Sequence, residues 1–232
     1  MIPKIIHQTA RTKQISWEER RLVRRMQRIL HGWTYMFHDD EDNERLIAQY
    51  FPQYLKQYQA ISRGVAKADI ARLVYMYVYG GFYFDTDYKL FHHIPEWMLE
   101  KEQLLMESRE KAEEYKLGNA ILASKPGGVF YKGFIEHIFE SPELSGIQEN
   151  RVELVTGPEA LTAYYMNNKA LYEKSVTIVP RPYFNPPIKF YGLCIKASKE
   201  SLGAHLCWGS WRSGSVIKRL FIYLQRKMQA VL

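Results

Sequence analysis

The feature that most restricts the fold is the stretch 62–87, where a helix pattern leads through two glycines into an aromatic strand and a pair of acids. From Ala66 to Tyr77, apolar residues recur at i, i+4, i+7, i+8 and i+11, the spacing of a helix with one buried face. Gly80-Gly81 is expected to end this helix, and Phe82-Tyr83-Phe84 is typical of a buried strand. A helix that leads directly into such a strand predicts an α/β protein.

Strand and helix patterns alternate along the rest of the chain. Short apolar runs predict strands at 4–7, 33–37, 82–84, 104–106, 120–123 and 176–179. Helices are predicted at 17–30, 43–50, 62–79 and 216–232, with another opening at 156–161; Ser16, Ser62 and Thr156 are the expected caps. This alternation predicts a mixed or mostly parallel sheet flanked by helices, formed by one domain (1–215) followed by a basic amphipathic C-terminal helix (216–232).

Composition excludes several classes of protein. The 232 residues are 47% hydrophobic and 25% charged, as in globular proteins, which excludes a disordered tail or a fibrous repeat. We find neither a signal-peptide pattern at the start nor an apolar run of membrane-spanning length. Cys194 and Cys207 are too few for a disulfide framework. We therefore expect a cytoplasmic protein.

The net charge of +7 is concentrated at the two ends. Residues 1–32 contain eight Lys or Arg and two Glu, and residues 201–232 contain five Lys or Arg and no acid. A basic amphipathic helix at 216–232 is suited to anionic lipid headgroups, and the predicted basic helix 17–30 could extend that surface. The tail could equally pack on the body of the protein. If the helix binds lipid headgroups, the protein is expected to associate peripherally with the inner face of the cell membrane.

The acid pair, Asp85 and Asp87, follows the aromatic strand. Ligands of open α/β sheets bind beyond the carboxyl ends of strands. In an extended backbone residues i and i+2 point to the same side, so these carboxylates would repel each other without a nearby cation. Mg²⁺ and Mn²⁺ prefer oxygen ligands and complete their shells with substrate phosphates. The pair therefore predicts a divalent-cation site, although a solvated loop has the same pattern.

Asp69 and Arg72 lie three residues apart and share one face of the predicted helix. They could form a surface ion pair. Alternatively, Arg72 could bind a phosphate or sugar oxygen while Asp69 accepts hydrogen bonds from hydroxyl groups. Helix spacing does not distinguish these two interpretations.

Five segments in order resemble the glycosyltransferases that have a DXD sugar-binding region. The segments are 2–8, 66–72, 80–87, 118–124 and 204–211. One departure is Ala68, where that family usually has serine. The resemblance implies a GT-A-type, Rossmann-like fold, a nucleotide-sugar donor, Mn²⁺ or Mg²⁺ as cofactor, and transfer with retention at the anomeric carbon.

The resemblance also implies roles for individual residues. Those implied to be catalytic are Asp69, Arg72, Asp85 and Asn119. Those implied to bind the donor are Ile6, His7, Gln8, Tyr83, Asp85, Ser210 and Trp211. The implied metal ligands are Asp85, Asp87 and His205, although His205 could equally be a packed, hydrogen-bonded histidine.

These observations lead to one main hypothesis and three alternatives. The main hypothesis is a metal-dependent retaining transferase that moves a hexose from a UDP-sugar to a saccharide or lipid-linked acceptor in capsule or other cell-surface polysaccharide synthesis. The first alternative is a GDP-mannose-dependent mannosyltransferase. The second, a metal-dependent nuclease or nucleic-acid binder, is disfavoured because only Lys89, and no basic array, flanks the acid pair. The third, a membrane-surface scaffold without activity, is disfavoured because Asp69, Arg72, Asp85 and Asp87 are all intact.

Overall fold

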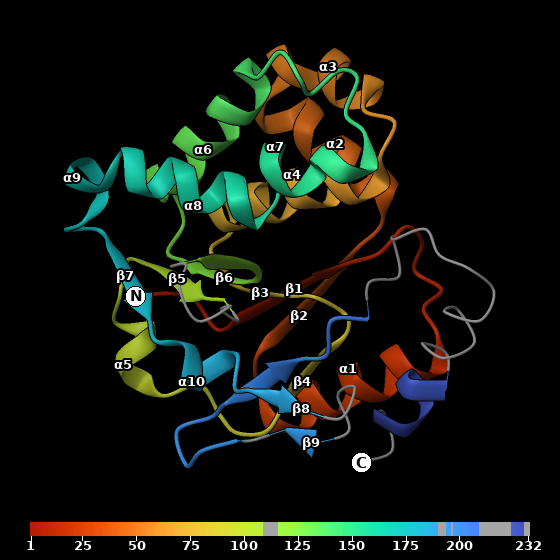
Figure 1. Ribbon diagram of the computed structural model, residues 1–232, viewed down its shortest axis with the longest axis vertical. Coiled ribbons are helices and arrows are strands. Elements are labelled where there is room, and N and C mark those ends of the chain that lie inside the picture. Colours follow the sequence, from red (N-terminus) through yellow and green to blue (C-terminus); the bar gives the residue numbers. More distant parts are fainter. Residues whose placement is uncertain (109–115, 190–193, 196, 209–223, 230–232) are drawn as a thin grey trace.

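The centre of the molecule is a six-stranded sheet of order β2-β1-β3-β6-β5-β7 (Figure 1). This computed structural model describes residues 1–108, 116–189, 194–195, 197–208 and 224–229. The strands are β1 Ile5–Thr9, β2 Thr34–His38, β3 Gly81–Phe84, β5 Gln103–Glu107, β6 Leu117–Ser124 and β7 Val176–Val179. β1 is parallel to β2 and β3, β5 is parallel to β7, and β6 is antiparallel to β3 and β5. The predicted mixed sheet is confirmed.

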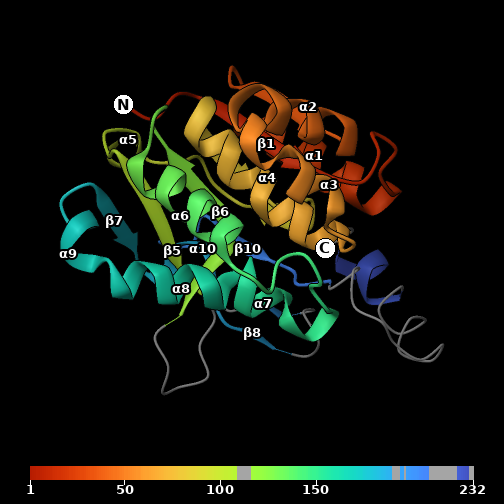
Figure 2. The same cartoon turned by 90° about the horizontal axis from the view of Figure 1, so that it is seen from above.

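Helices cover both faces of the sheet (Figures 1 and 2). On one face lie α2 Asp40–Tyr50, α3 Leu55–Ala60, α4 Gly64–Val78, α6 Val129–Glu140, α7 Val152–Val155, α8 Pro158–Asn167 and α9 Lys169–Tyr172, with the short 3₁₀ turns Pro52–Tyr54 and Glu149–Arg151. On the other lie α1 Trp17–Ile29, α5 Glu96–Leu99 and α10 Arg181–Phe184. Two small antiparallel sheets lie on that second side. They pair β4 Tyr88–Leu90 with β10 Gly203–His205, and β8 Ile188–Lys189 with β9 Cys194–Ile195.

The aromatic strand β3 shows how the sheet separates two cores. Because strand side chains alternate between faces, Phe82 and Phe84 pack into the core beside α1 and α5, whereas Tyr83 packs into the core beneath α4 and α6. All three side chains are buried. The absence of a solvent-exposed face explains why the strand is apolar at every position.

Two glycines make the turn from α4 into β3. Gly80 has φ +64° and Gly81 has φ +91°, a region of backbone conformation that side chains disfavour. A Cβ atom on Gly81 would lie 2.6 Å from the carbonyl oxygen of Ile5, a residue of the neighbouring strand β1. Glycine is therefore needed at 81 for its conformation and for the close approach of β1.

Helix starts follow the sequence predictions only in part. Ser16 and Glu19 form the capping box of α1, which confirms the predicted cap. The predicted caps of the other two helices are wrong: α4 begins after Arg63 without a side-chain cap, two residues beyond Ser62, and α8 begins after Gly157. Pro158 supplies the first turn of α8, and its ring needs no amide partner there.

Only part of the predicted C-terminal helix lies within the described residues. Residues 224–229 are helical, and the rest of 216–232 lies outside the described residues. Figure 1 shows this short helix, in blue, beside the start of α1. Across the described ranges, none of the helices has both the length and the apolar character needed to cross a bilayer.

Candidate active site

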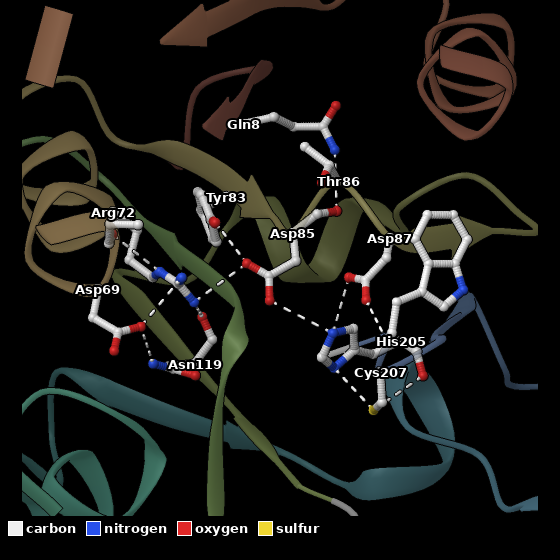
Figure 3. Close-up of polar contacts among 12 residues, drawn as sticks. Gln8, Asp69, Arg72, Tyr83, Asp85, Thr86, Asp87, Asn119, His205 and Cys207 are labelled. Atoms are coloured by element: carbon white, nitrogen blue, oxygen red, sulfur yellow. Dashed lines mark hydrogen bonds and ion pairs between the residues drawn. The ribbon is translucent and has the colours of Figure 1, made fainter. Parts of the chain in front are cut away.

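A cavity of about 980 Å³ lies beyond the carboxyl ends of β1 and β3. Open α/β sheets bind ligands in this position. The lining includes Thr9 from β1, the acid pair after β3, Asp69 and Arg72 of α4, Asn119 of β6, Gly157 and Pro158 at the start of α8, and His205, Cys207 and Trp208. The structure therefore brings residues from distant parts of the chain to one cavity, several of which are shown in Figure 3.

The acid pair lies in a tight turn between β3 and β4, not in the extended backbone that the sequence suggested. The Asp85 amide donates to the Ala120 carbonyl, and the Tyr88 amide donates back to the Asp85 carbonyl. The turn, and not strand alternation, therefore directs both carboxylates toward the same point.

His205 reaches that point through strand pairing. β10 is antiparallel to β4, and His205 lies opposite Tyr88, one residue after the acid pair. Its Nε2 is 3.0 Å from Asp87 Oδ1 and 3.5 Å from Asp85 Oδ2 (Figure 3). The Trp208 amide also donates to Asp87 Oδ2, at 2.8 Å. The β4–β10 pairing was not predicted, because three-residue strands give a weak sequence signal.

The electrostatics of this group favour a positive charge between the two carboxylates. Burial opposes a charge on His205, but the facing Asp87 carboxylate raises the pKa of the imidazole well above its ordinary value. Burial also opposes the charge of Asp87, yet His205 and the Trp208 amide bring its pKa below its ordinary value. The site therefore holds a negative Asp87 and attracts a cation.

The three side chains fit a divalent cation. Asp85, Asp87 and His205 each offer one ligand atom, and these atoms lie within 4.8 Å of one another. Two carboxylate oxygens and one imidazole nitrogen suit Mn²⁺, and a mainly oxygen set completed by phosphate also suits Mg²⁺. The predicted grouping of His205 with the acid pair is thus what the structure shows, whereas metal binding itself stays a prediction.

A second polar group, Asp69, Arg72, Asn119 and Thr156, lies at the end of the cavity nearer α4 and α8. Asp69 Oδ1 accepts from Asn119 Nδ2 at 2.9 Å and pairs with Arg72 at 3.2 Å. Its other oxygen accepts from the Thr156 hydroxyl at 2.9 Å. Asp69 and Arg72 are 4% and 5% exposed, so the interpretation of a surface ion pair is wrong.

Asp85 connects the two polar groups. Its Oδ1 accepts from the Tyr83 hydroxyl at 2.6 Å and lies 3.3 Å from Arg72 Nη1, while its Oδ2 faces His205. The Arg72 guanidinium also lies 4.7 Å from the centre of the Tyr83 ring and donates to the Asn119 carbonyl at 2.8 Å. Arg72 is therefore fixed in orientation on several sides.

The protonation of Asp69 depends on this arrangement. Burial raises the pKa of its carboxyl to about 6, although Arg72 and the Thr156 hydroxyl act in the opposite direction. For Arg72, burial disfavours the charge, but Asp85 and Tyr83 raise the pKa of the guanidinium above its ordinary value. At neutral pH the group therefore contains a charged arginine and a mostly ionised aspartate.

The predicted donor-binding residues of β1 have different positions. Ile6 and His7 are buried in the core and do not line the cavity, which does not support direct contact with a donor. His7 instead hydrogen-bonds the Gly80 carbonyl at 2.9 Å and stacks on Tyr75. Gln8 is also buried; its amide donates to the Asp85 carbonyl at 3.1 Å and so supports the acid-pair turn. The predicted donor ligands Ser210 and Trp211 lie outside the described residues.

The Thr-Gly-Pro segment at 156–158 also resembles one of the family, which implies a position near the donor or acceptor cleft; Thr156, expected to cap a helix, holds Asp69 there. Two residues of this site, Glu19 and Cys207, were missed as functional candidates. Glu19, of the α1 capping box, also accepts from the Thr86 hydroxyl between the two acids, at 2.9 Å. Cys207 lies 3.4 Å from His205 Nδ1 and has φ +53°, which is unusual for a residue with a side chain.

Comparison with known proteins agrees with this geometry. Residues 15–107, which contain α4 and the acid pair, match the family described as "Glycosyltransferase sugar-binding region containing DXD motif". This match confirms the resemblance to glycosyltransferases with a DXD sugar-binding region. Asp85-Thr86-Asp87 has the D-x-D pattern and lies within the matched residues.

Curated relatives are yeast proteins. The chain is 34% identical over 86 residues to inositol phosphoceramide mannosyltransferase 3 of Schizosaccharomyces pombe, a match that covers 37% of the chain and 24% of that protein. It is 23% identical over 188 residues to inositol phosphoceramide mannosyltransferase 2 of the same yeast, covering 78% of the chain and 49% of that protein. These alignments span less than half of the length of either relative.

A solved structure shows the same fold. PaToxG glycosyltransferase aligns with a TM-score of 0.56 and 19% identity over 75% of this chain and 73% of that chain. The predicted GT-A-type fold is confirmed.

Proposed function

We propose that this domain transfers a hexosyl group from a nucleotide sugar to a hydroxyl acceptor, with a divalent cation held by Asp85, Asp87 and His205. The observation that carries the proposal is the position of Asp85. One of its carboxylate oxygens belongs to the Asp–Asp–His group and the other to the buried Arg72–Tyr83 pair. A bound donor would then have its diphosphate at the first group and its sugar at the second.

The leaving group of such a transfer is a nucleoside diphosphate, so negative charge develops on its phosphate oxygens. A divalent cation at the acid pair would supply the charge that neutralises it. Arg72, fixed by Asn119 and Asp85, presents a further positive charge that needs no reorganisation during the reaction. Pre-fixed charges of this kind act strongly in a buried site.

The sugar carbon becomes oxocarbenium-like as its bond to the diphosphate breaks. Asp69 is buried beside Arg72 and is mostly ionised above its pKa of about 6. A negative carboxylate at this position would stabilise the developing positive charge of the sugar ring. Retention of anomeric configuration, which the motif resemblance implies, is part of the proposal.

We propose mannose as the transferred sugar and a lipid-linked glycan or polar lipid as the acceptor. The support is the similarity to two proteins named inositol phosphoceramide mannosyltransferases. A UDP-hexose donor and a capsular or other saccharide acceptor form the second candidate, supported by the motif resemblance. Ala68, in place of the usual serine, lines the cavity and could contribute to donor choice.

A donor-hydrolysis assay tests the proposal. Purified protein is incubated with GDP-mannose, UDP-glucose, UDP-galactose or UDP-N-acetylglucosamine, with Mn²⁺, with Mg²⁺ or without a divalent cation, and the released nucleoside diphosphate is measured. A parallel incubation with an oligonucleotide measures its cleavage. We expect release from GDP-mannose that requires Mn²⁺ or Mg²⁺. Release from a UDP-sugar alone would favour the second candidate, and cleavage of an oligonucleotide without any sugar-nucleotide turnover would refute both.

A carboxylate substitution makes the test specific. Asp87→Asn removes one charge from the proposed cation site and should lower turnover at least 100-fold, a loss typical for an essential electrostatic group. Glu173→Gln, which changes an exposed acid beyond α9, is the matched control. Undiminished activity in Asp87→Asn would remove this residue from the cation site.

A further inference from the structure

The outer side of α1 is basic and lacks acids. Arg20, Arg21, Arg24 and Arg28 are exposed on it. The two acids of α1, Glu18 and Glu19, lie on the inward side, where Glu18 is 6% exposed. Trp17, the first residue of the helix, is 47% exposed. The guanidinium carbon of Arg21 lies 5.6 Å from the centre of the Trp17 ring.

The helix 224–229 packs beside this surface through its polar side. Arg226 donates to the Ser16 hydroxyl oxygen at 3.1 Å, and Lys227 pairs with Glu18 at 3.5 Å. Gln229, 2% exposed, accepts a hydrogen bond from the Trp208 indole at 2.5 Å. Polar contacts thus hold the helix against the domain.

This orientation leaves apolar side chains outside. Leu224 and Met228, one turn apart, are 53% and 51% exposed. Lys227, between them, also lies 5.8 Å from the centre of the Trp17 ring. The apolar side chains of the tail therefore do not pack on the domain at these positions, and they belong to the short helix that contacts the start of α1 through Arg226 and Lys227.

We propose that this surface, formed by Trp17, the four exposed α1 arginines, Leu224 and Met228, docks on an anionic lipid bilayer. Arginines supply attraction to anionic headgroups, while tryptophan, leucine and methionine can enter the headgroup–acyl boundary. Exposed apolar side chains next to cations are typical of surfaces that bind at the membrane interface. Tryptophan and arginine both have an apolar part that can enter the headgroup region and a polar or charged end that stays in water. A nucleic acid could also bind the arginines, but binding to nucleic acid does not explain why Leu224 and Met228 are exposed on the same surface.

The surface is physically connected to the cavity. Glu19 receives a hydrogen bond from Thr86 of the DXD turn and lies 3.8 Å from Arg226. Trp208 lines the cavity and contacts both Arg226 and Gln229. If the proposed function holds, docking places the cavity next to the bilayer and so gives access to a lipid-linked acceptor.

Vesicle sedimentation tests this surface without depending on catalysis. The full chain is mixed with vesicles of phosphatidylcholine alone or with about 30% phosphatidylglycerol, at about 0.1 M and 0.5 M NaCl. We expect binding only to the anionic vesicles, weakened by salt because the attraction is screened. Arg20→Gln with Arg24→Gln should weaken partitioning about 30-fold, since each cation near an anionic surface contributes roughly a factor of five.

Two further variants separate the contributions of the surface. Leu224→Ser with Met228→Ser should reduce binding at both salt concentrations, because insertion of apolar groups is not screened by salt. Lys169→Gln with Lys174→Gln and Met166→Ser with Leu171→Ser, all at exposed positions on and around α9, are the matched controls and should bind as the unaltered protein does. Melting temperatures of every variant show whether the fold is retained.

Several results would overturn the proposal. Equal binding to neutral vesicles would do so, as would unchanged binding of the folded arginine variant, or full displacement from vesicles by duplex DNA at equal phosphate concentration. The two proposals can fail separately. Vesicle binding without sugar-nucleotide turnover refutes only the proposed function, and turnover without vesicle binding refutes only the docking surface.

Discussion

Replacing Thr156 with valine tests whether a single hydroxyl group sets the protonation of Asp69. The Thr156 side chain is 1% exposed, and its hydroxyl donates to Asp69 Oδ2 at 2.9 Å. Valine has nearly the same shape but no hydroxyl, so the substitution removes the hydrogen bond without opening a cavity. The substitution therefore destabilises the ionised form of Asp69 more than the protonated form, because a charged carboxylate accepts the stronger hydrogen bond.

The magnitude follows from the type of bond. A hydrogen bond to a charged, buried group contributes about 1.5–3 kcal/mol, and one pKa unit corresponds to about 1.4 kcal/mol. Because this bond favours the ionised carboxylate, its loss should raise the pKa of Asp69 by roughly 1–2 units above about 6. Activity at pH 7 should then fall, and the acidic limb of the pH profile should move upward by the same amount.

The assay is the pH dependence of donor turnover between about pH 5 and 9. Thr156→Ser keeps the hydroxyl and should restore the original limb. Thr162→Val removes a hydroxyl that donates to the Pro158 carbonyl within α8 instead of to Asp69, and it should leave the limb unmoved. If Thr156→Val lowers activity equally at every pH, the hydroxyl has only a structural role and the assignment of the limb to Asp69 is wrong.

Two further predictions concern stability. Gly81→Ala should lower the free energy of unfolding by about 3 kcal/mol or more, measured by urea denaturation, because its Cβ would lie 2.6 Å from the Ile5 carbonyl oxygen at φ +91°; a loss below about 1 kcal/mol would contradict this. Burial lowers the pKa of His7 to about 3 and of His38 to about 4, so between pH 7 and pH 5 the unfolded chain gains protons that the folded state excludes. This costs about 3–4 kcal/mol of stability, and Asp69, whose raised pKa of about 6 lets the folded state take up a proton in the same range, offsets roughly 1 kcal/mol, so stability should fall by about 2 kcal/mol. His38→Gln should reduce this loss and the exposed His137→Gln should not, and equal urea midpoints at the two pH values would refute the argument.

The sequence alone determined the order of the main elements. The apolar spacing between 66 and 77 set α4, the two glycines set its end, and six apolar runs set the six strands of the sheet. These features depend on residues close together in the chain, so local periodicity and turn chemistry are sufficient to predict them. The same local pattern placed two acids at the carboxyl end of a strand, where a ligand site was expected.

Only the tertiary structure decided which side chains meet at the site. His205 reaches the acid pair because β10 pairs with β4, and Thr156 reaches Asp69 because α8 packs on β6. Both contacts join residues more than 80 positions apart, and short strands and loop hydroxyls give no periodic signal. Conversely, the buried position of His7 depends on the stacking of Tyr75 and on the approach of Gly80, which no pattern around residue 7 could indicate. Local sequence thus determined where the chain turns. Long-range packing determined which polar groups are buried next to one another, and this burial shifts their pKa values.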